Sequence, residues 1–332
     1  MTEEPLMDAC LDNSEACDLT YFAFAASAAA PRAATVQQAI DVLPEVLAGR
    51  YQIERLLGVG GMGAVYRARD LLREQYGEPE PYVALKALTE DFAEYPDANA
   101  LLYTEFALTS RLSHRHVIRV FSFEVDSGSQ RAFITLELLK GCTLAQLLLS
   151  HPQGLPWQQA HEVSLALLEA LSYAHGEGVL HGDIKPSNLM LGDEGVRLFD
   201  FGLGQAEEQR LPGLPRLCRS RFAAWTPRYA APELLEGAAL SPAADVYAVA
   251  CVIYELCSGQ HPLRRLSAKQ AKAVELPLSA ATGLPKSLWP TLRAALAYEA
   301  SERCSLPALL AAFSDYQAPS SRLPRWLTRQ SG

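Results

Sequence analysis

The first part of the chain has the hydrophobic pattern of strands, and the later part has that of helices. Short runs in which apolar and polar residues alternate, bounded by Gly, Pro or charged residues, are typical of half-buried strands. Such runs predict strands over 51–57, 64–68, 82–88, 117–125 and 131–138. A helix is predicted over 100–112 by the helical spacing of Leu101, Leu102, Leu108 and Leu112.

After Gly141 the apolar spacing changes to about 3.6 residues, the period of an α-helix. Helices are predicted over 143–150, 161–175 and 246–257, and the second is apolar enough along one side to be buried. Two apolar runs, 189–191 and 196–199, are separated by Gly-Asp-Glu-Gly and predict a small hairpin.

The N-terminal segment differs from the rest of the chain. Residues 1–34 are acidic and then Ala-rich, which predicts a flexible lead-in. Residues 35–47 have apolar positions at helical spacing, so a short amphipathic helix with a docking or regulatory role is the alternative to a solvated lead-in, although Pro44 disfavours its second half.

Charge and hydropathy limit the classes of protein to which this chain can belong. The 332 residues carry a formal net charge of −9, which argues against a general nucleic-acid binder because phosphate backbones require clustered Lys and Arg. The first eighteen residues contain six acidic residues and no Lys or Arg, the wrong charge for a secretory signal peptide. Segment 246–257 is too short to span a bilayer. We therefore expect a cytoplasmic protein without a transmembrane segment.

The stretch 181–202 holds most of the candidate chemistry. Its sequence is H-G-D-I-K-P-S-N-L-M-L-G-D-E-G-V-R-L-F-D-F-G. Asp183 can accept a hydroxyl proton, Asn188 can offer an amide oxygen to a cation, and Asp200 can chelate one. Lys185 adds a positive charge two residues after Asp183. The predicted hairpin would hold the base at one end and the metal ligand at the other.

A second candidate region precedes it. The loop G-V-G-G-M-G, residues 58–63, is followed by a strand pattern, whereas the glycine loop of a dinucleotide-binding fold leads into a helix. Such a hairpin loop can lie over phosphates because glycines let backbone N–H groups approach closely. Lys86 lies in the middle of an apolar strand, where an unpaired charge is costly. It either points outward from an edge strand or pairs with a phosphate and with Glu105 on the predicted helix.

These motifs resemble those of eukaryotic-type (Hanks-type) bacterial serine/threonine protein kinases, in a non-RD variant whose H-R-D arginine is Gly182. Three later features fit the same family: T-P-R-Y-A-A-P-E from Thr226 to Glu233, Asp245 at the start of an apolar helix, and S-E-R ending at Arg303. In the family, the Asp supports the catalytic loop from beneath and the late Arg pairs with the A-P-E Glu.

The resemblance implies an α+β, bilobal fold with a small β-rich N-lobe containing one main helix and a larger, mainly helical C-lobe. The implied boundaries are a largely flexible tail over 1–47, the N-lobe over 48–137, the C-lobe over 138–316 and a C-terminal tail over 317–332. The implied activity is transfer of the γ-phosphoryl group of ATP, with Mg²⁺ (or Mn²⁺), to Ser and Thr hydroxyls of protein substrates, including the kinase itself.

The resemblance also assigns roles to single residues. Asp183 would be the base, Lys185 would neutralise the transferring phosphoryl group, Thr226 would brace both, and Lys86 held by Glu105 would bind phosphates; Asn188 and Asp200 would bind metal. The nucleotide would be contacted by Leu57, Gly58, Gly60, Gly61, Gly63, Val65, Ala84, Lys86, Leu136, Glu137, Leu139 and Met190.

Two alternatives stay open at this point. One is a nucleotide-binding pseudokinase or scaffold, suggested by Gly182 and by Thr109, where the family usually has an apolar residue. The other is a kinase-like small-molecule phosphotransferase, against which the segment from Thr226 to Glu233 argues because it shapes a peptide-binding ledge. The oligomeric state and the physiological substrate are not predicted.

Overall fold

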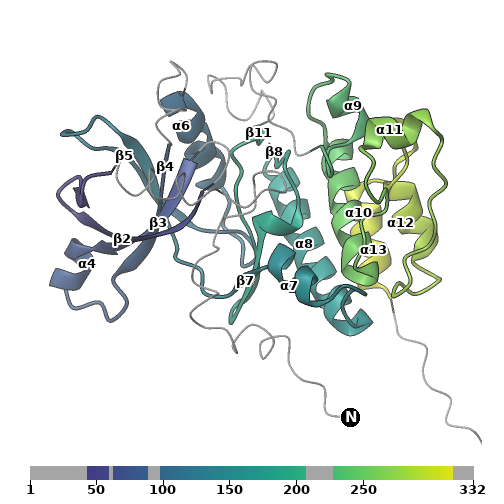
Figure 1. Ribbon diagram of the computed structural model, residues 1–332, viewed down its shortest axis with the longest axis horizontal. Coiled ribbons are helices and arrows are strands. Elements are labelled where there is room, and N and C mark those ends of the chain that lie inside the picture. The colour runs from purple at the N-terminus through teal and green to yellow at the C-terminus, as the bar shows by residue number, and fades with distance from the viewer. Residues whose placement is uncertain (1–42, 60–62, 89–97, 207–226, 317–332) are drawn as a thin grey trace, which may run out of the picture.

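The computed structural model describes residues 43–59, 63–88, 98–206 and 227–316 (Figure 1). Gly60, Gly61 and Thr226 lie outside the described residues, as do most of the expected N-terminal tail and all of the expected C-terminal tail, 317–332. The described chain forms the two-lobed α+β arrangement expected from the sequence, with a sheet in one half and helices in the other.

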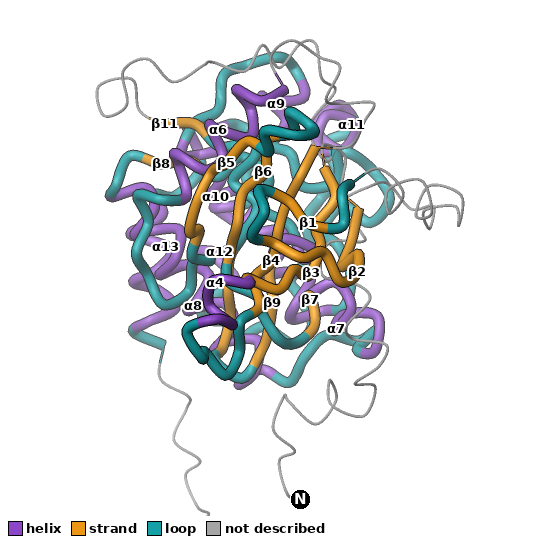
Figure 2. The backbone as a smooth tube through the Cα atoms, turned by 90° about the vertical axis from the view of Figure 1, so that its left-hand side faces the viewer, coloured by secondary structure: helices purple, strands orange, loops and turns teal. Residues whose placement is uncertain are grey.

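The first half is an antiparallel sheet of six strands in the order β1-β2-β3-β4-β6-β5. The strands are β1 (Val46–Leu47), β2 (Tyr51–Val59), β3 (Gly63–Asp70), β4 (Tyr82–Leu88), β5 (Val120–Val125) and β6 (Ala132–Leu136). In Figure 2 the sheet faces the viewer, and the helical half lies behind it. All five predicted strands are therefore present, although β5 begins three residues later than the pattern suggested.

Alternation along β3 and β4 gives the sheet two buried faces. One face packs Tyr66 and Leu85 with Phe133, and the other packs Val65 and Ala84 with residues of the single long helix of this half, α6 (Ala98–Thr109). Successive side chains of a strand point to opposite faces, so Lys86 lies on the α6 side together with Ala84. The edge-strand alternative for Lys86 is thus wrong.

Two local features were not predicted from the sequence pattern. Val46–Leu47 is a strand paired with Tyr51–Gln52, so the amphipathic helix considered for 35–47 does not extend to these residues. The connection after β3 contains a short helix, α4 (Leu71–Gln75), that the sequence pattern did not indicate. Asp70 caps it by accepting from the backbone N–H groups of Leu72 (3.1 Å) and Arg73 (3.4 Å).

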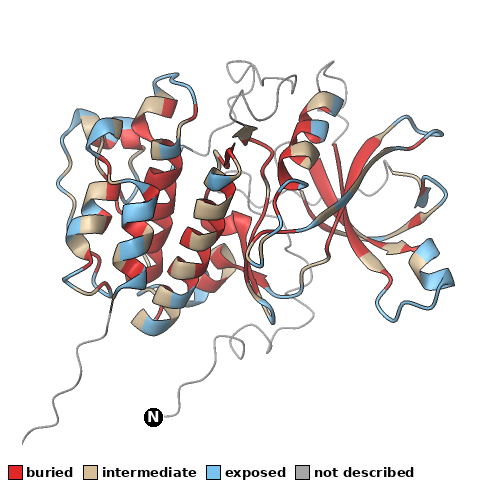
Figure 3. Ribbon diagram, turned by 180° about the vertical axis from the view of Figure 1, so that it is seen from behind, coloured by how far each residue is buried: buried red, intermediate tan, exposed pale blue. Residues whose placement is uncertain are grey.

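The second half is built around one buried helix, α10 (Pro242–Ser258), which contacts α8 (Trp157–Gly176), α12 (Trp289–Ala295) and α13 (Leu306–Ser314). Buried residues line the inner faces of these helices and of the sheet (Figure 3). The other helices are α7 (Leu144–Ser150), α9 (Pro232–Leu235) and α11 (Ala268–Ala273), with 3₁₀ turns η1 (Pro186–Asn188) and η3 (Ala300–Glu302). Within the described ranges, no helix combines the length and apolar character needed to cross a membrane.

Small strands lie where the two halves meet. The predicted hairpin is present as β9 (Leu189–Gly192) and β10 (Gly195–Leu198), and β9 also pairs with β7 (Cys142–Thr143). A further antiparallel pair joins β8 (Val179–Leu180) to β11 (Gln205–Ala206). The loop between β8 and β9 and the residues after β10 therefore emerge on the side facing the sheet and α6, which positions the candidate site.

Candidate functional site

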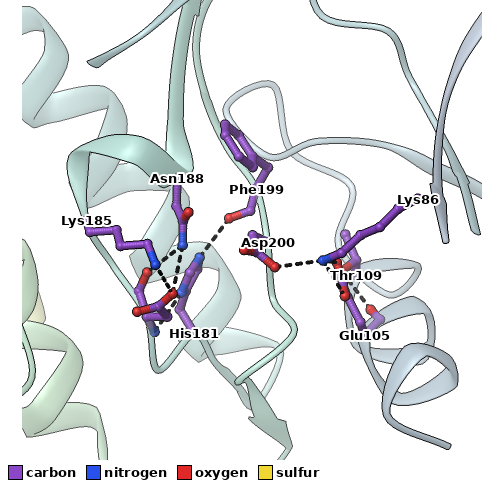
Figure 4. A network of polar contacts seen from close by, with 9 residues as sticks. Lys86, Glu105, Thr109, His181, Lys185, Asn188, Phe199 and Asp200 are labelled. Atoms are coloured by element: carbon purple, nitrogen blue, oxygen red, sulfur yellow. Dashed lines mark hydrogen bonds and ion pairs between the residues drawn. The ribbon is translucent and has the colours of Figure 1, made fainter. Parts of the chain in front are cut away.

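The centre of the site is a buried ion-pair cluster that joins three elements (Figure 4). Lys86 on β4 places its Nζ 2.7 Å from both carboxylate oxygens of Glu105 on α6. The same Nζ lies 2.9 Å from Oδ1 of Asp200, which follows β10. The side chains of Lys86 and Glu105 are 10% and 7% exposed, so each charge depends on the other for its stabilisation.

Lys86 is the shared partner of two carboxylates that oppose each other: burial and the charge of Asp200 raise the pKa of Glu105, and Lys86 offsets this only in part. Burial alone would lower the pKa of Lys86, but Asp200 and Glu105 outweigh it and raise that pKa, so the amine stays protonated. Burial raises the pKa of Asp200, yet Lys86 and Lys185 together lower it to about 2. Asp200 is therefore a carboxylate at neutral pH and can bind a cation. With one amine between two carboxylates, the cluster can bind a phosphate group and a metal ion side by side.

The loop between β8 and β9 carries the second group of polar side chains. Nζ of Lys185 lies 2.6 Å from Oδ2 of Asp183, and both side chains are nearly buried. Nδ2 of Asn188 donates to the backbone carbonyl of Asp183 (2.8 Å) and to its Oδ2 (3.2 Å). Asn188 thereby fixes the Asp183 carboxylate in one orientation, with Lys185 beside it.

The oxygen of the Asn188 side-chain amide is suited to bind a metal ion. Its Oδ1 is buried and has no hydrogen-bond partner among the described residues, which is uncommon for a buried polar atom. The N–H of Phe199 donates to the carbonyl of Asn188 (3.1 Å), which brings Asp200, the next residue, to the same place. An amide oxygen and a carboxylate are the ligands that Mg²⁺ prefers. Over the described ranges there is no group of three or more His, Cys, Asp or Glu that could hold a metal, so phosphate and water oxygens would complete the shell.

The backbone of this loop is held from below. Asp245 at the start of α10 is 1% exposed and accepts from the N–H groups of His181 and Gly182, each at 2.9 Å. This confirms the support expected from the sequence. Gly182 has φ +78°, and a Cβ at this position would meet the carbonyl oxygen of Leu203 at 2.8 Å. Glycine therefore suits the turn that points both N–H groups at one carboxylate.

Two histidines support the loop. Nδ1 of His181 accepts from the N–H of Asp183 (3.1 Å), so its Nε2 donates to the carbonyl of Phe199 (3.1 Å). His175 on α8 supports the loop through Asp245, which its Nε2 contacts at 2.9 Å. Sequence spacing could not reveal this contact, because the two residues are seventy positions apart.

An apolar cluster of side chains lies next to the charged cluster. The expected nucleotide-contacting residues come together in one buried group, against which the half-buried Leu139 packs: Leu57, Val65, Ala84, Leu136 and Met190. Gly58 lies near the end of β2, and Gly63 is the first residue of β3. A Cβ added at Gly63 would meet the carbonyl oxygen of Ala87 at 2.6 Å. The carboxylate of Glu137 accepts from the backbone N–H and from Nε of Arg119, both at 3.0 Å, a side-chain role that the sequence did not indicate.

The A-P-E segment is tied to the end of the helical half. Nη1 and Nη2 of Arg303 lie 2.6 and 2.8 Å from Oε1 and Oε2 of Glu233, and the Arg303 side chain is 0% exposed. The pairing expected from the sequence is thereby confirmed. It fixes the start of α9 and, with it, the segment that runs toward Asp183.

Comparison with known proteins gives a consistent picture. The sequence model of the protein kinase domain matches residues 51–311. Serine/threonine-protein kinase pkn3 of Myxococcus xanthus is 34% identical over 69% of this chain and 41% of its own length. PknH of Mycobacterium tuberculosis is 30% identical over 77% of this chain and 40% of its own length. This chain thus spans less than half of these relatives.

A solved structure agrees with the fold. The crystal structure of a mutant PknI kinase domain from Mycobacterium tuberculosis matches with a TM-score of 0.59 and 27% sequence identity. The match covers 81% of this chain and 96% of that domain.

Proposed function

The chain belongs to the protein kinase domain family, and on that premise we propose that it transfers the γ-phosphoryl group of ATP to Ser and Thr hydroxyls of proteins, including its own. One observation carries this proposal: Lys86 bridges Glu105 and Asp200 while Asn188 turns a partnerless buried oxygen toward the same place. Phosphoryl transfer depends mainly on positioning and charge neutralisation, and this cluster supplies both.

Each polar residue has a role in this proposal. Lys86, oriented by Glu105, binds the α- and β-phosphates. Asn188 and Asp200 would hold a divalent cation, for which their oxygens favour Mg²⁺, with Mn²⁺ as the alternative. A cation held there would supply neutralisation of the phosphate charge. Asp183 orients the acceptor hydroxyl and receives its proton, and Lys185 stabilises the charge on the transferring group.

The apolar group is the proposed adenine pocket. Leu57, Val65 and Ala84 would cover one side of the base and Met190 the other, with Leu136 limiting the depth of the pocket. Backbone groups of Glu137 and Leu139 would meet the polar edge of the base. Burial of a flat aromatic ring between apolar side chains supplies affinity, and the backbone contacts supply orientation.

Serine and threonine are the proposed acceptors for two reasons. The names of the relatives specify serine/threonine kinases, and Lys185 lies two residues beyond Asp183, as in that subgroup. Thr226, the proposed brace for Asp183, lies outside the described residues. The paired state of Lys86, Glu105, Asp183 and Asp200 favours a catalyst over the pseudokinase or scaffold alternative.

We also propose that activation depends little on loop phosphorylation, because Gly182 offers no charge to a phosphate. Exposed charge pairs elsewhere contribute about 0–1 kcal/mol, or at most about a fivefold change in a rare active population. Ser220→Ala, at a site outside the described residues, should keep its initial rate within that factor. A hundredfold loss or a long autoactivation lag would contradict the proposal.

The activity itself is tested by incubating the purified chain with labelled ATP, Mg²⁺ and a generic basic protein, followed by mass-spectrometric mapping of phosphosites. Phosphoserine and phosphothreonine should appear on substrate or on the chain itself. Asp200→Ala, prepared in parallel, separates this activity from a contaminating kinase. Nucleotide binding without any phosphate transfer would contradict the proposal and support the scaffold alternative, and mainly phosphotyrosine would contradict the Ser/Thr assignment.

A further inference from the structure

An arginine–glutamate pair joins the A-P-E segment to helix α10. Arg228 donates from Nη2 to Oε1 of Glu255 on α10 (3.0 Å). The hydroxyl of Tyr229 donates to the other oxygen, Oε2, at 2.6 Å. Both oxygens of the Glu255 carboxylate are therefore engaged by neighbouring residues of one short segment.

The segment that carries Arg228 borders the loop of the proposed base. A small cavity is lined by Asp183 and Ile184 from the catalytic loop and by Tyr229, Ala230 and Ala231 from the A-P-E segment. Tyr229 is directly bonded to Arg228 in the chain. A polypeptide whose hydroxyl reaches Asp183 would thus place its flanking side chains near Arg228.

The two side chains of the pair differ in their exposure to solvent. The Arg228 side chain is 47% exposed, whereas that of Glu255 is 11% exposed and is covered by Arg228 and Tyr229. His261, whose ring packs edge-on against Tyr229, adds no charge, because burial lowers its pKa to about 3. An approaching peptide therefore meets the edge of a guanidinium group rather than a carboxylate.

We propose that Arg228 is a specificity-determining residue that favours an acidic side chain close to the phosphorylated Ser or Thr. This inference rests on the proposed kinase function. A guanidinium carries several N–H donors in a planar fork, so it can bind a second carboxylate while it stays bonded to Glu255. Because the site is half-exposed, the expected preference is modest, about two- to fivefold in kcat/KM.

The test uses the full chain and a set of Ser peptides that differ only in one flanking position, occupied by Asp, Ala or Lys and moved along either side of the Ser. At one or more positions the wild type should prefer Asp over Lys by about two- to fivefold. Arg228→Ala should remove this preference, and Arg228→Glu should reverse it. Arg228→Gln, which keeps side-chain donors for Glu255, should also lose the preference while preserving the fold.

Arg115→Ala is the matched control, because Arg115 forms an ion pair with Glu169 (2.9 Å) from an exposed position and, within the described residues, has no hydrogen bond or ion pair with the A-P-E segment. It should leave the preference unchanged. Equal wild-type rates on Asp and Lys peptides at every position, or a preference that persists in Arg228→Ala, would overturn the inference and leave the proposed activity intact. Failure to phosphorylate any peptide or protein would instead overturn the proposed activity on which the inference depends.

Discussion

Replacing Glu233 by Gln tests how far the helical half depends on one buried ion pair. The substitution keeps the shape of the side chain but removes the charge that lies 2.6 and 2.8 Å from the guanidinium of Arg303. Arg303 is 0% exposed in its side chain and cannot turn to water. Removing one partner of a buried pair costs about 3–5 kcal/mol, because the remaining charge is left uncompensated.

The remaining contacts of Arg303 favour the lower end of this range of about 3–5 kcal/mol. The Arg303 guanidinium also donates to the carbonyl oxygens of Ala243 (3.0 Å), Ala297 (2.8 Å) and Tyr298 (3.0 Å), which the substitution leaves in place. The Glu233 side chain is 20% exposed, so part of its charge was already screened by water. We therefore expect the free energy of unfolding to fall by about 3 kcal/mol.

The measurement is urea unfolding followed by far-ultraviolet circular dichroism, with linear extrapolation to water. Glu169→Gln is the matched control, since Glu169 lies 2.9 Å from Arg115 with side chains 38% and 71% exposed. An exposed pair of this kind contributes about 0–1 kcal/mol and weakens in salt, whereas the buried pair should not. Equal losses for the two variants would refute the assignment of stability to the Glu233–Arg303 pair.

Three further predictions concern the catalytic loop. Asp183→Asn should lower the rate of phosphoryl transfer by about 10²–10⁴ while nucleotide affinity, measured by calorimetry, is retained; a near-wild-type rate would show that another group is the base. Asn188→Ala should raise the Mg²⁺ concentration needed for half-maximal activity, and an unchanged Mg²⁺ titration would argue against Oδ1 as a ligand. Gly182→Ala should lower the free energy of unfolding by about 1–2 kcal/mol in urea, because φ is +78° at this position; no loss would mean that the loop adopts another conformation.

The parts of the fold that could be predicted are those whose signal is local. The strand around Lys86 is a short apolar run, and the helix around Glu105 has Leu residues at helical spacing. A buried Lys in an apolar strand already demands a partner. The hairpin joining Asn188 to Asp200 was likewise visible from its turn residues. Much of the candidate site could thus be placed from sequence periods and motif resemblance together.

The parts that were missed depend on contacts between distant residues. Helix α4 is capped by Asp70, whose side chain is also held by Arg50 (2.7 Å) from the turn before β2. The strand Val46–Leu47 exists only because the chain turns back onto Tyr51 through Ala48 and Gly49, both with positive φ. The hydrophobic pattern of the sequence predicts neither helix α4 nor the strand Val46–Leu47.

At Thr109, too, the sequence alone could not show how the side chain is accommodated. Its position suggested weaker packing of the helix, since the family usually has an apolar residue there. In the structure Thr109 is 2% exposed, and its hydroxyl donates to the carbonyl of Glu105 (2.8 Å), so the polar group is satisfied within the helix itself. The preceding residue, Leu108, lies in the same buried cluster as Phe201. The helix can therefore hold Glu105 against Lys86 without an apolar side chain at 109.

Asp245, which supports the loop before Asp183, belongs to the helical half, and its charge state decides whether that support is present. Burial raises the pKa of Asp245, but the hydrogen bond from His175 and the charges around it outweigh burial and lower that pKa. Asp245 therefore remains a carboxylate at neutral pH and keeps accepting from the N–H groups of His181 and Gly182. Because the folded-state pKa is depressed, this contribution to stability is complete above the unfolded pKa and is lost as the pH falls through the folded value. The backbone just before Asp183 is thus positioned by a buried carboxylate that stays charged over the physiological range, and the Gly182 turn lets both N–H groups reach it without a positive side chain at that position.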